Sequence, residues 1–367
     1  MTEQQLPLID WATAAGTGAR LVPRGPAVSP DEARAAVTQL RAGAARAAEL
    51  VGEYTGLNAP PDPSAVRVVD RPGWIEANVA DLRTLVGPLE DRMRRVRPTP
   101  GLIAQTVTPR LAGAETGALL AFLAVRVLGQ YELVPPTVGT DATAVATSRL
   151  LLVAPNVVAV ERGLAVDPTD FRLWVCLHEE THRTQFTAVP WLRDYLLGQI
   201  NTYLETLEMD PAAVARQVRD GVVALGRTVG RAVSGRDPGE GPSLLEAVQT
   251  PAQREVLDRL TAVMSLVEGH AEVVMDEVGR AVVPSVATIR ARFSQRRATH
   301  GVVDLVVRQL LGLDAKMRQY ADGAVFVRGV LDQAGREGLD AVWAGPQNLP
   351  TVTELADPGS WLRRVHG

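Results

Sequence analysis

The stretch from Phe171 to Leu192 reads FRLWVCLHEETHRTQFTAVPWL, and it decides how the rest of the chain is interpreted. Residues 178–182, HEETH, form a His-Glu-x-x-His pattern. Residues four apart share one face of a helix, so both imidazoles can reach a single ion. The pattern therefore predicts a zinc site with His178 and His182 as ligands. Glu179 projects beside them and is predicted to be the general base that accepts a proton from water.

We expect this segment to be one buried helix. The sequence DPTD at residues 167–170 supplies a capping residue, a proline at the first helical position and an acid at the third. The helix should run to about Thr187, because Pro190 follows. The apolar run LWVCL at residues 173–177 favours burial, and two buried histidines one turn apart are costly unless something binds them. The alternative is a surface helix that matches the motif by chance, and the unusual charge of Glu180 counts towards it.

Zinc needs a third protein ligand, and the sequence offers one on a second helix. One class of zinc enzymes has a glycine three residues after the second histidine and a histidine six after it. Gln185 and Ala188 occupy these positions here, which excludes that class. Glu268 is the best candidate, because it follows the apolar face of the helix predicted over Pro251–Val278. Glu272 lies one turn later, where it can hydrogen-bond the second nitrogen of a ligand histidine.

The residues alone leave several alternatives open. His270 is a rival third ligand, although it points roughly 200° away around the helix if Glu268 faces the metal. Asp276 is a weaker candidate than Glu272 for holding a histidine. Arg318, Tyr320 and His270 are candidates for stabilising a transition state, with Tyr320 favoured as a phenol donor. The alternative for these acids is an ordinary solvated helix face, and for the donors a structural role.

The composition predicts a mainly helical protein. Of 367 residues, 46% are hydrophobic, which is enough to bury a large core. Only 4% are aromatic, and such a composition favours helices. Leu150–Glu161 is rich in Val and Leu and is split by a Pro-Asn pair, so we expect a small β element of two short strands around a turn. Residues 1–145 are expected to form an N-terminal helical region and residues 146–367 the metal-binding region, packed as one unit. SGRDPGEGPS at residues 234–243 is expected to be a surface loop.

Charge and cysteine content argue against several classes of protein. The formal net charge is −4, the pI is near 5.8 and charges are interspersed, so nucleic acid is not an expected partner. The one cysteine, Cys176, excludes an intramolecular disulfide and is expected in the core. Met1–Pro7 lacks the features of a signal peptide, and Gly117–Gly129 carries Arg126 and is too short to cross a bilayer. We therefore expect a cytoplasmic protein with no membrane partner.

Several segments resemble an actinobacterial family of zincin-like hydrolases that is associated by name with coenzyme F420 biosynthesis. The core Glu268-Gly269-His270-Ala271 is similar to the second zinc-binding helix of glutamate-type zincins. The segments that carry the family resemblance are residues 8–11 (LIDW), 128–131 (LGQY), 171–192, 266–276 (LVEGHAEVVMD), 318–320 (RQY) and 348–351 (NLPT). The resemblance implies a mostly helical zincin-like fold with His178 and His182 as zinc ligands, Glu179 as base and Glu268 as third ligand.

Together these features predict a zinc-dependent hydrolase, most simply a metallopeptidase that cleaves peptide or amide bonds. Three protein ligands leave the fourth position of the metal open for a water molecule, whose proton Glu179 accepts. A narrow pocket would instead indicate a hydrolase of small amides or esters. A fourth protein ligand would indicate structural zinc in a non-catalytic helical binding protein, and intact Glu179 argues against a zincin that has lost its activity. The strands expected at residues 150–160 would offer backbone groups to an extended peptide.

Overall fold

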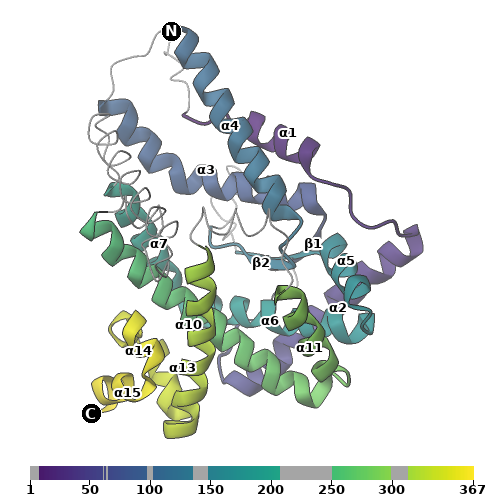
Figure 1. Cartoon of the computed structure of the whole chain (residues 1–367), viewed down its shortest axis with the longest axis vertical. Coiled ribbons are helices and arrows are strands. Elements are labelled where there is room, and N and C mark those ends of the chain that lie inside the picture. Colours follow the sequence, from purple (N-terminus) through teal and green to yellow (C-terminus); the bar gives the residue numbers. More distant parts are fainter. Residues whose placement is uncertain are drawn as a thin grey trace, which may run out of the picture. The chain divides into compact units, whose positions relative to one another are not determined.

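The computed structural model describes residues 8–60, 62, 65–96, 102–134, 148–206, 250–298 and 313–367. Contacts divide the chain into two compact units. The first consists of Met1–Ala188 and Val274–Phe293, and the second of Val189–Val273 and Ser294–Gly367. Both are built mainly from helices (Figure 1). The surface loop expected at residues 234–243 lies outside the described residues.

A three-stranded sheet lies at the centre of the first unit. Its strands are β1 (Val66–Val69), β2 (Gly129–Tyr131) and β3 (Leu150–Val153), in the order β1-β3-β2. β3 is parallel to β1 and antiparallel to β2. The four residues of β3 are fully buried, as expected of an apolar central strand. The sheet thus joins strands from both sides of the division expected at residue 145, which itself stays a prediction.

Helices cover both faces of this sheet. Successive side chains of a strand point to opposite faces, so β3 contributes to a core on each side. Leu151 and Val153 point into a core built with helices α1, α3 and α4. Leu152 points into the other core, which α2, α5 and α6 share. The bounds of these helices are α1 Trp11–Leu21, α2 Pro30–Thr55, α3 Arg71–Val96, α4 Leu102–Ala124, α5 Ala154–Leu164 and α6 Pro168–Ala188. The sheet and its two helical layers therefore hold α6, the helix that carries the HEETH motif (Figure 1).

The β element is shorter than the sequence predicted. Leu150–Val153 is a strand, but the second strand expected up to Glu161 is instead part of helix α5. Pro155 lies in the first turn of α5, where its missing N–H costs nothing. Asn156 is buried, and its amide donates to the carbonyl oxygens of Ala124 at 2.7 Å and of Val127 at 2.6 Å. The Pro-Asn pair thus begins a helix rather than a hairpin turn.

The second unit is helical among its described residues. Its elements are α7 (Pro190–Glu205), the first part of α10 (Pro251–Val282), α13 (Leu313–Asp340), the short turns η2 (Ala341–Trp343) and η3 (Pro346–Asn348), α14 (Val352–Ala356) and α15 (Pro358–His366). Trp361 of α15 is fully buried, packs edge-on against Phe326 and donates its indole N–H to the Asn348 carbonyl at 2.7 Å. These contacts fasten the C-terminal helix to α13.

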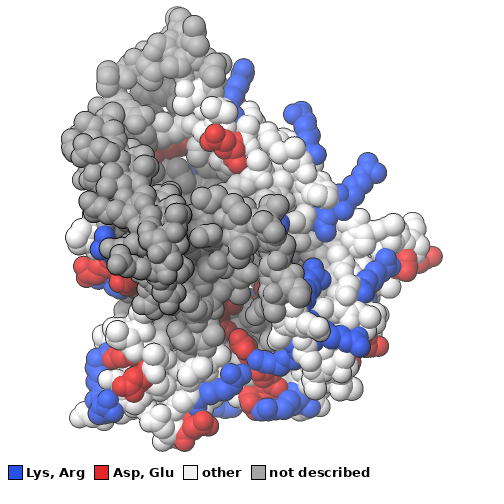
Figure 2. Space-filling model, in the orientation of Figure 1, with Lys and Arg blue, Asp and Glu red and all other residues white. Residues whose placement is uncertain are grey.

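Helix α10 belongs to both units. From Val274 onward its side chains pack in the core of the first unit with Trp174 and Val175 of α6, and α11 (Val286–Ala298) follows it there. The helix predicted over Pro251–Val278 and the one predicted from Pro168 to about Thr187 are both present. None of the described helices is both long enough and apolar enough to cross a membrane. On the face drawn in Figure 2, acidic and basic side chains of the described residues lie interspersed.

Candidate metal centre

His178 and His182 lie on one face of α6 with their ring nitrogens converging. The two Nε2 atoms are 3.1 Å apart, and the rings meet edge-on with centroids 4.7 Å apart. Two nitrogens about 2.05 Å from one tetrahedral zinc ion would be about 3.3 Å apart. The spacing of the two histidines therefore already matches that of a zinc site.

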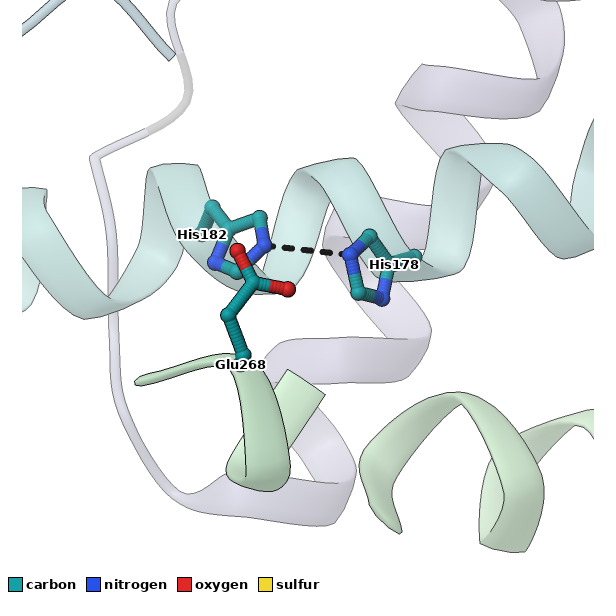
Figure 3. A group of neighbouring side chains, drawn as sticks. All are labelled: His178, His182 and Glu268. Atoms are coloured by element: carbon teal, nitrogen blue, oxygen red, sulfur yellow. Dashed lines mark hydrogen bonds between the residues drawn. The ribbon is translucent and has the colours of Figure 1, made fainter. Parts of the chain in front are cut away.

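Glu268 of α10 supplies a third donor to the same place. One ligand atom from each of His178, His182 and Glu268 lies within 4.8 Å of the others, and none of the three side chains is exposed (Figure 3). Glu268 lies less than two turns before Val274 on one uninterrupted helix, and the helix packs against α6 from Val274 onward. Glu268 thus lies on the same continuous helix whose later residues pack against α6.

A close helix crossing fixes the backbone beside Glu268. A Cβ atom placed on Gly269 would lie 2.1 Å from the carbonyl carbon of Gly323 in α13, and one on Gly323 would lie 1.8 Å from the Ser265 carbonyl oxygen. Backbone cannot give way as a flexible side chain does, so only glycine fits at either position. Next to this crossing, His270 is buried and packs edge-on against Trp343, with ring centroids 5.2 Å apart. Among the described residues His270 is not part of the three-residue group.

Glu179 lies against the edge strand of the sheet. Its side chain is buried, and a Cβ atom placed on Gly129 of β2 would lie 2.5 Å from its carboxyl carbon and 2.8 Å from Oε2. The missing side chain of Gly129 is therefore what gives the carboxylate its room. On the helix Glu179 follows His178 directly, and its carboxylate lies against Gly129 of β2.

Gln185 holds the second histidine. The Nδ1 atom of His182 lies 3.1 Å from Oε1 of Gln185, whose side chain is completely buried. A carbonyl oxygen only accepts hydrogen bonds, so Nδ1 carries the proton and the lone pair of His182 is left on Nε2, facing His178. In the sequence, Gln185 only excluded one class of zinc enzymes and was not predicted to contact a histidine. Its position three residues after His182 is the signal that would have identified it, since such residues are neighbours on a helix.

The charge of Glu180 is matched by Arg183 on the opposite side of the motif. The two buried side chains form an ion pair, and Arg183 also donates to the Pro60 carbonyl at 3.4 Å. Burial raises the pKa of Glu180 to about 7, although Arg183 opposes the shift. Cys176 is buried as expected, and its burial raises the pKa of the thiol, so the sulfur is not a ready nucleophile.

The remaining predicted residues have different outcomes. Asp276 forms an ion pair with Arg290 of α11, which gives it a structural partner. Glu272 lies one turn after Glu268 on α10, and its proposed contact to a histidine stays a prediction. Tyr320 lies within α13, but its side chain, like that of Arg318, is outside what the structure describes. A transition-state role for Tyr320 therefore also stays a prediction.

The donor set fits zinc. Two imidazoles and one carboxylate are a known ligand set of catalytic zinc sites, in which a fourth position stays open. The group of ligating side chains around the two histidines has three members in the described part of the chain. Among the described residues this number matches a catalytic zinc site, which takes three protein ligands, rather than a structural site, which takes four.

Comparison with known proteins gives the same class. Residues 9–362 match the model of the zincin-like metallopeptidase family, and the chain belongs to this family. It is also similar to the crystal structure of "a putative hydrolase with a novel fold" from Chloroflexus aurantiacus, with 31% sequence identity and a TM-score of 0.69. The similarity covers 98% of this chain and 99% of that one. A search of curated proteins found no match. The mainly helical zincin-like fold predicted from the sequence is thus confirmed.

Proposed function

We propose that this protein is a zinc-dependent metallopeptidase with His178, His182 and Glu268 as metal ligands and Glu179 as general base. The observation that carries the proposal is the convergence of three donor atoms within 4.8 Å, beside a buried glutamate. Membership of the zincin-like metallopeptidase family supports the same class of chemistry. A cytoplasmic location and an association with coenzyme F420 stay predictions from the sequence.

Each residue around the candidate metal centre has a separate role in the proposed reaction. When bound, a zinc ion polarises the substrate carbonyl and lowers the pKa of water. Glu179 accepts the proton of the attacking water and passes it to the leaving amine, so one carboxylate serves as base and then as acid. Gln185 keeps the His182 ring in the tautomer whose Nε2 lone pair faces the metal position. The tight packing of Gly129 limits the positions open to the Glu179 carboxylate.

The outer edge of β2 supports an extended substrate. In an antiparallel pair, residues that hydrogen-bond to the partner strand alternate with residues that do not. Leu128 and Glu132 are bonded residues, because Val153 N donates to Leu128 O and Glu132 N donates to Arg149 O, both at 2.8 Å. Gly129 and Tyr131 lie at the alternate positions, which do not bond to β3. The N–H and C=O groups of Gly129 and Tyr131 therefore point away from β3, and no described strand lies beyond them. A peptide can add to such an edge as a further strand.

This edge replaces the one that the sequence suggested. Residues 150–160 were expected to present backbone groups to a substrate, but β3 lies between β1 and β2, and its bonds are taken on both sides. β2 contacts α6, and its Gly129 lies against Glu179. A peptide along β2 would pass close to the proposed base, which favours a peptide over a small amide as substrate.

Metal content and hydrolysis in matched variants test this function. The parent should bind one zinc ion per chain by metal analysis and cleave members of a peptide library. Glu179→Gln should keep the zinc and lose hydrolysis, whereas Glu268→Gln should lower zinc affinity. Glu255→Gln, an exposed glutamate of the same helix α10, should change neither. Equal peptide hydrolysis by the parent and Glu179→Gln, or a parent without stoichiometric zinc, would refute the proposal.

A further inference from the structure

Two aromatic rings are stacked one turn beyond the candidate metal centre. The rings of Tyr131, at the end of β2, and Phe186 of α6 are parallel to within 2°, with centroids 5.3 Å apart. On α6, Glu179, His182 and Phe186 follow one another at spacings of three and four residues, so they share a stripe of the helix. The aromatic pair therefore continues the line that begins at the proposed base and passes the metal.

The same stripe lies under β2. Side chains two apart in a strand point to the same face, and here Gly129 faces Glu179 while Tyr131 faces Phe186. Gln130, between them, points to the opposite face and donates to Asn78 of α3 at 3.0 Å. Any peptide that extends the sheet beyond β2 would place alternate side chains on the α6 face as well.

From this geometry we propose that the enzyme prefers substrates with a large apolar side chain beside Tyr131. This proposal rests on the proposed peptidase function and adds the class of peptide. In an antiparallel pairing, the substrate residue opposite Gly129 lies nearest Glu179, and the peptide bond that follows this residue is the one cleaved. The residue opposite Tyr131 is then two positions earlier in the substrate. Cross-strand aromatic pairs and pairs of an aromatic with a β-branched residue stabilise sheets in this arrangement.

The surroundings of Tyr131 favour an apolar partner over a charged one. Of the two rings, Phe186 is buried and Tyr131 is half-buried, so Tyr131 is the ring that a substrate can contact. The charged residue next to Tyr131 in the chain, Glu132, is already paired, because its carboxylate accepts two hydrogen bonds from Arg149 at 2.7 and 3.2 Å. Asp81 of α3 lies in the same group, and burial together with the Glu132 carboxylate raises its pKa to about 7. No unmatched charge is thus offered to the substrate among these groups.

Cleavage profiling of peptide libraries by mass spectrometry tests the preference. The zinc-loaded parent should cleave peptides enriched in Phe, Tyr, Leu or Ile at the third residue before the broken bond. Tyr131→Thr removes the ring but keeps a strand-forming residue, and it should lower kcat/KM for these peptides roughly 2- to 10-fold, the range of one aromatic contact. Peptides with Ser at that position should change little. Tyr131→Phe should behave as the parent, and Glu179→Gln corrects for contaminating proteases.

A binding measurement separates this inference from the function on which it rests. In zinc-loaded Glu179→Gln protein, a labelled peptide with Phe at the third position should bind more tightly than one with Ser, and adding Tyr131→Thr should abolish the difference. Peptide cleavage with the same preference in Tyr131→Thr would overturn the inference and leave the peptidase function standing. A parent that neither binds nor cleaves peptides would overturn both.

Discussion

Replacement of Gly129 by alanine should separate catalysis from folding and metal binding. The added Cβ would lie 2.5 Å from the Glu179 carboxyl carbon and 2.7 Å from its Cγ, where carbon atoms normally keep about 3.5–4.0 Å. The carboxylate must therefore move by about 1 Å, and a displacement of that size can cost about 100-fold in rate. The atoms that must move belong to the end of a flexible side chain, so stability should change little. We expect kcat/KM to fall about 100-fold with zinc content and Tm nearly unchanged.

Gly16→Ala is the matched control for this experiment. Gly16 lies inside helix α1 of the same unit, and an added Cβ there meets nothing within 4 Å. Alanine forms helices better than glycine, so the control should be as active as the parent and slightly more stable. Peptide turnover, zinc content and Tm are compared among the parent, Gly129→Ala and Gly16→Ala. Full activity of Gly129→Ala at unchanged stability would show that catalysis does not depend on the position of the Glu179 carboxylate.

Three further predictions concern residues around the centre. Gln185→Leu removes the acceptor for His182 and should weaken zinc binding about 10- to 100-fold in a chelator competition, whereas Gln185→Glu should not weaken it. Equal zinc affinity of the parent and Gln185→Leu would contradict this role of Gln185. Arg183→Met leaves Glu180 buried without its partner and should cost about 3–5 kcal/mol in urea unfolding, most of which a second change, Glu180→Leu, should restore. Asp81→Asn should stabilise the fold by about 1–2 kcal/mol near pH 8 and hardly at all near pH 4. The raised pKa of Asp81 means that its ionisation costs stability as the pH rises from about 4 to about 7, and a gain that did not depend on pH would refute this.

Much of the candidate site follows from local sequence rules. His178, Glu179 and His182 are brought together by the period of a single helix, and α6 formed where its capping residues and its proline predicted. Glu268 was selected because it follows an apolar helical face, and the structure places it at the histidines. These predictions needed only helical periodicity and the chemistry of zinc ligands.

The sheet was harder to predict because short apolar runs do not specify their own secondary structure. Leu150–Val153 became a strand, while Ala154–Leu164, equally rich in valine, became helix α5. The deciding contacts come from elsewhere in the chain: Asn156 also accepts a hydrogen bond from Arg71, 85 residues away. Likewise β2, only three residues long, is recognisable as a strand only by its pairing with β3.

The sequence by itself determined which side chains of α6 form the candidate metal centre, because a helix repeats every 3.6 residues and so fixes which side chains of HEETH meet. Only the tertiary structure decided what surrounds them: the glycine of β2 against Glu179, the stacked pair of Tyr131 and Phe186, and the close crossing at Gly269. Each of these contacts joins residues far apart in the chain, where no period of the sequence relates one to the other. Their geometry arises from packing, which depends on the whole fold.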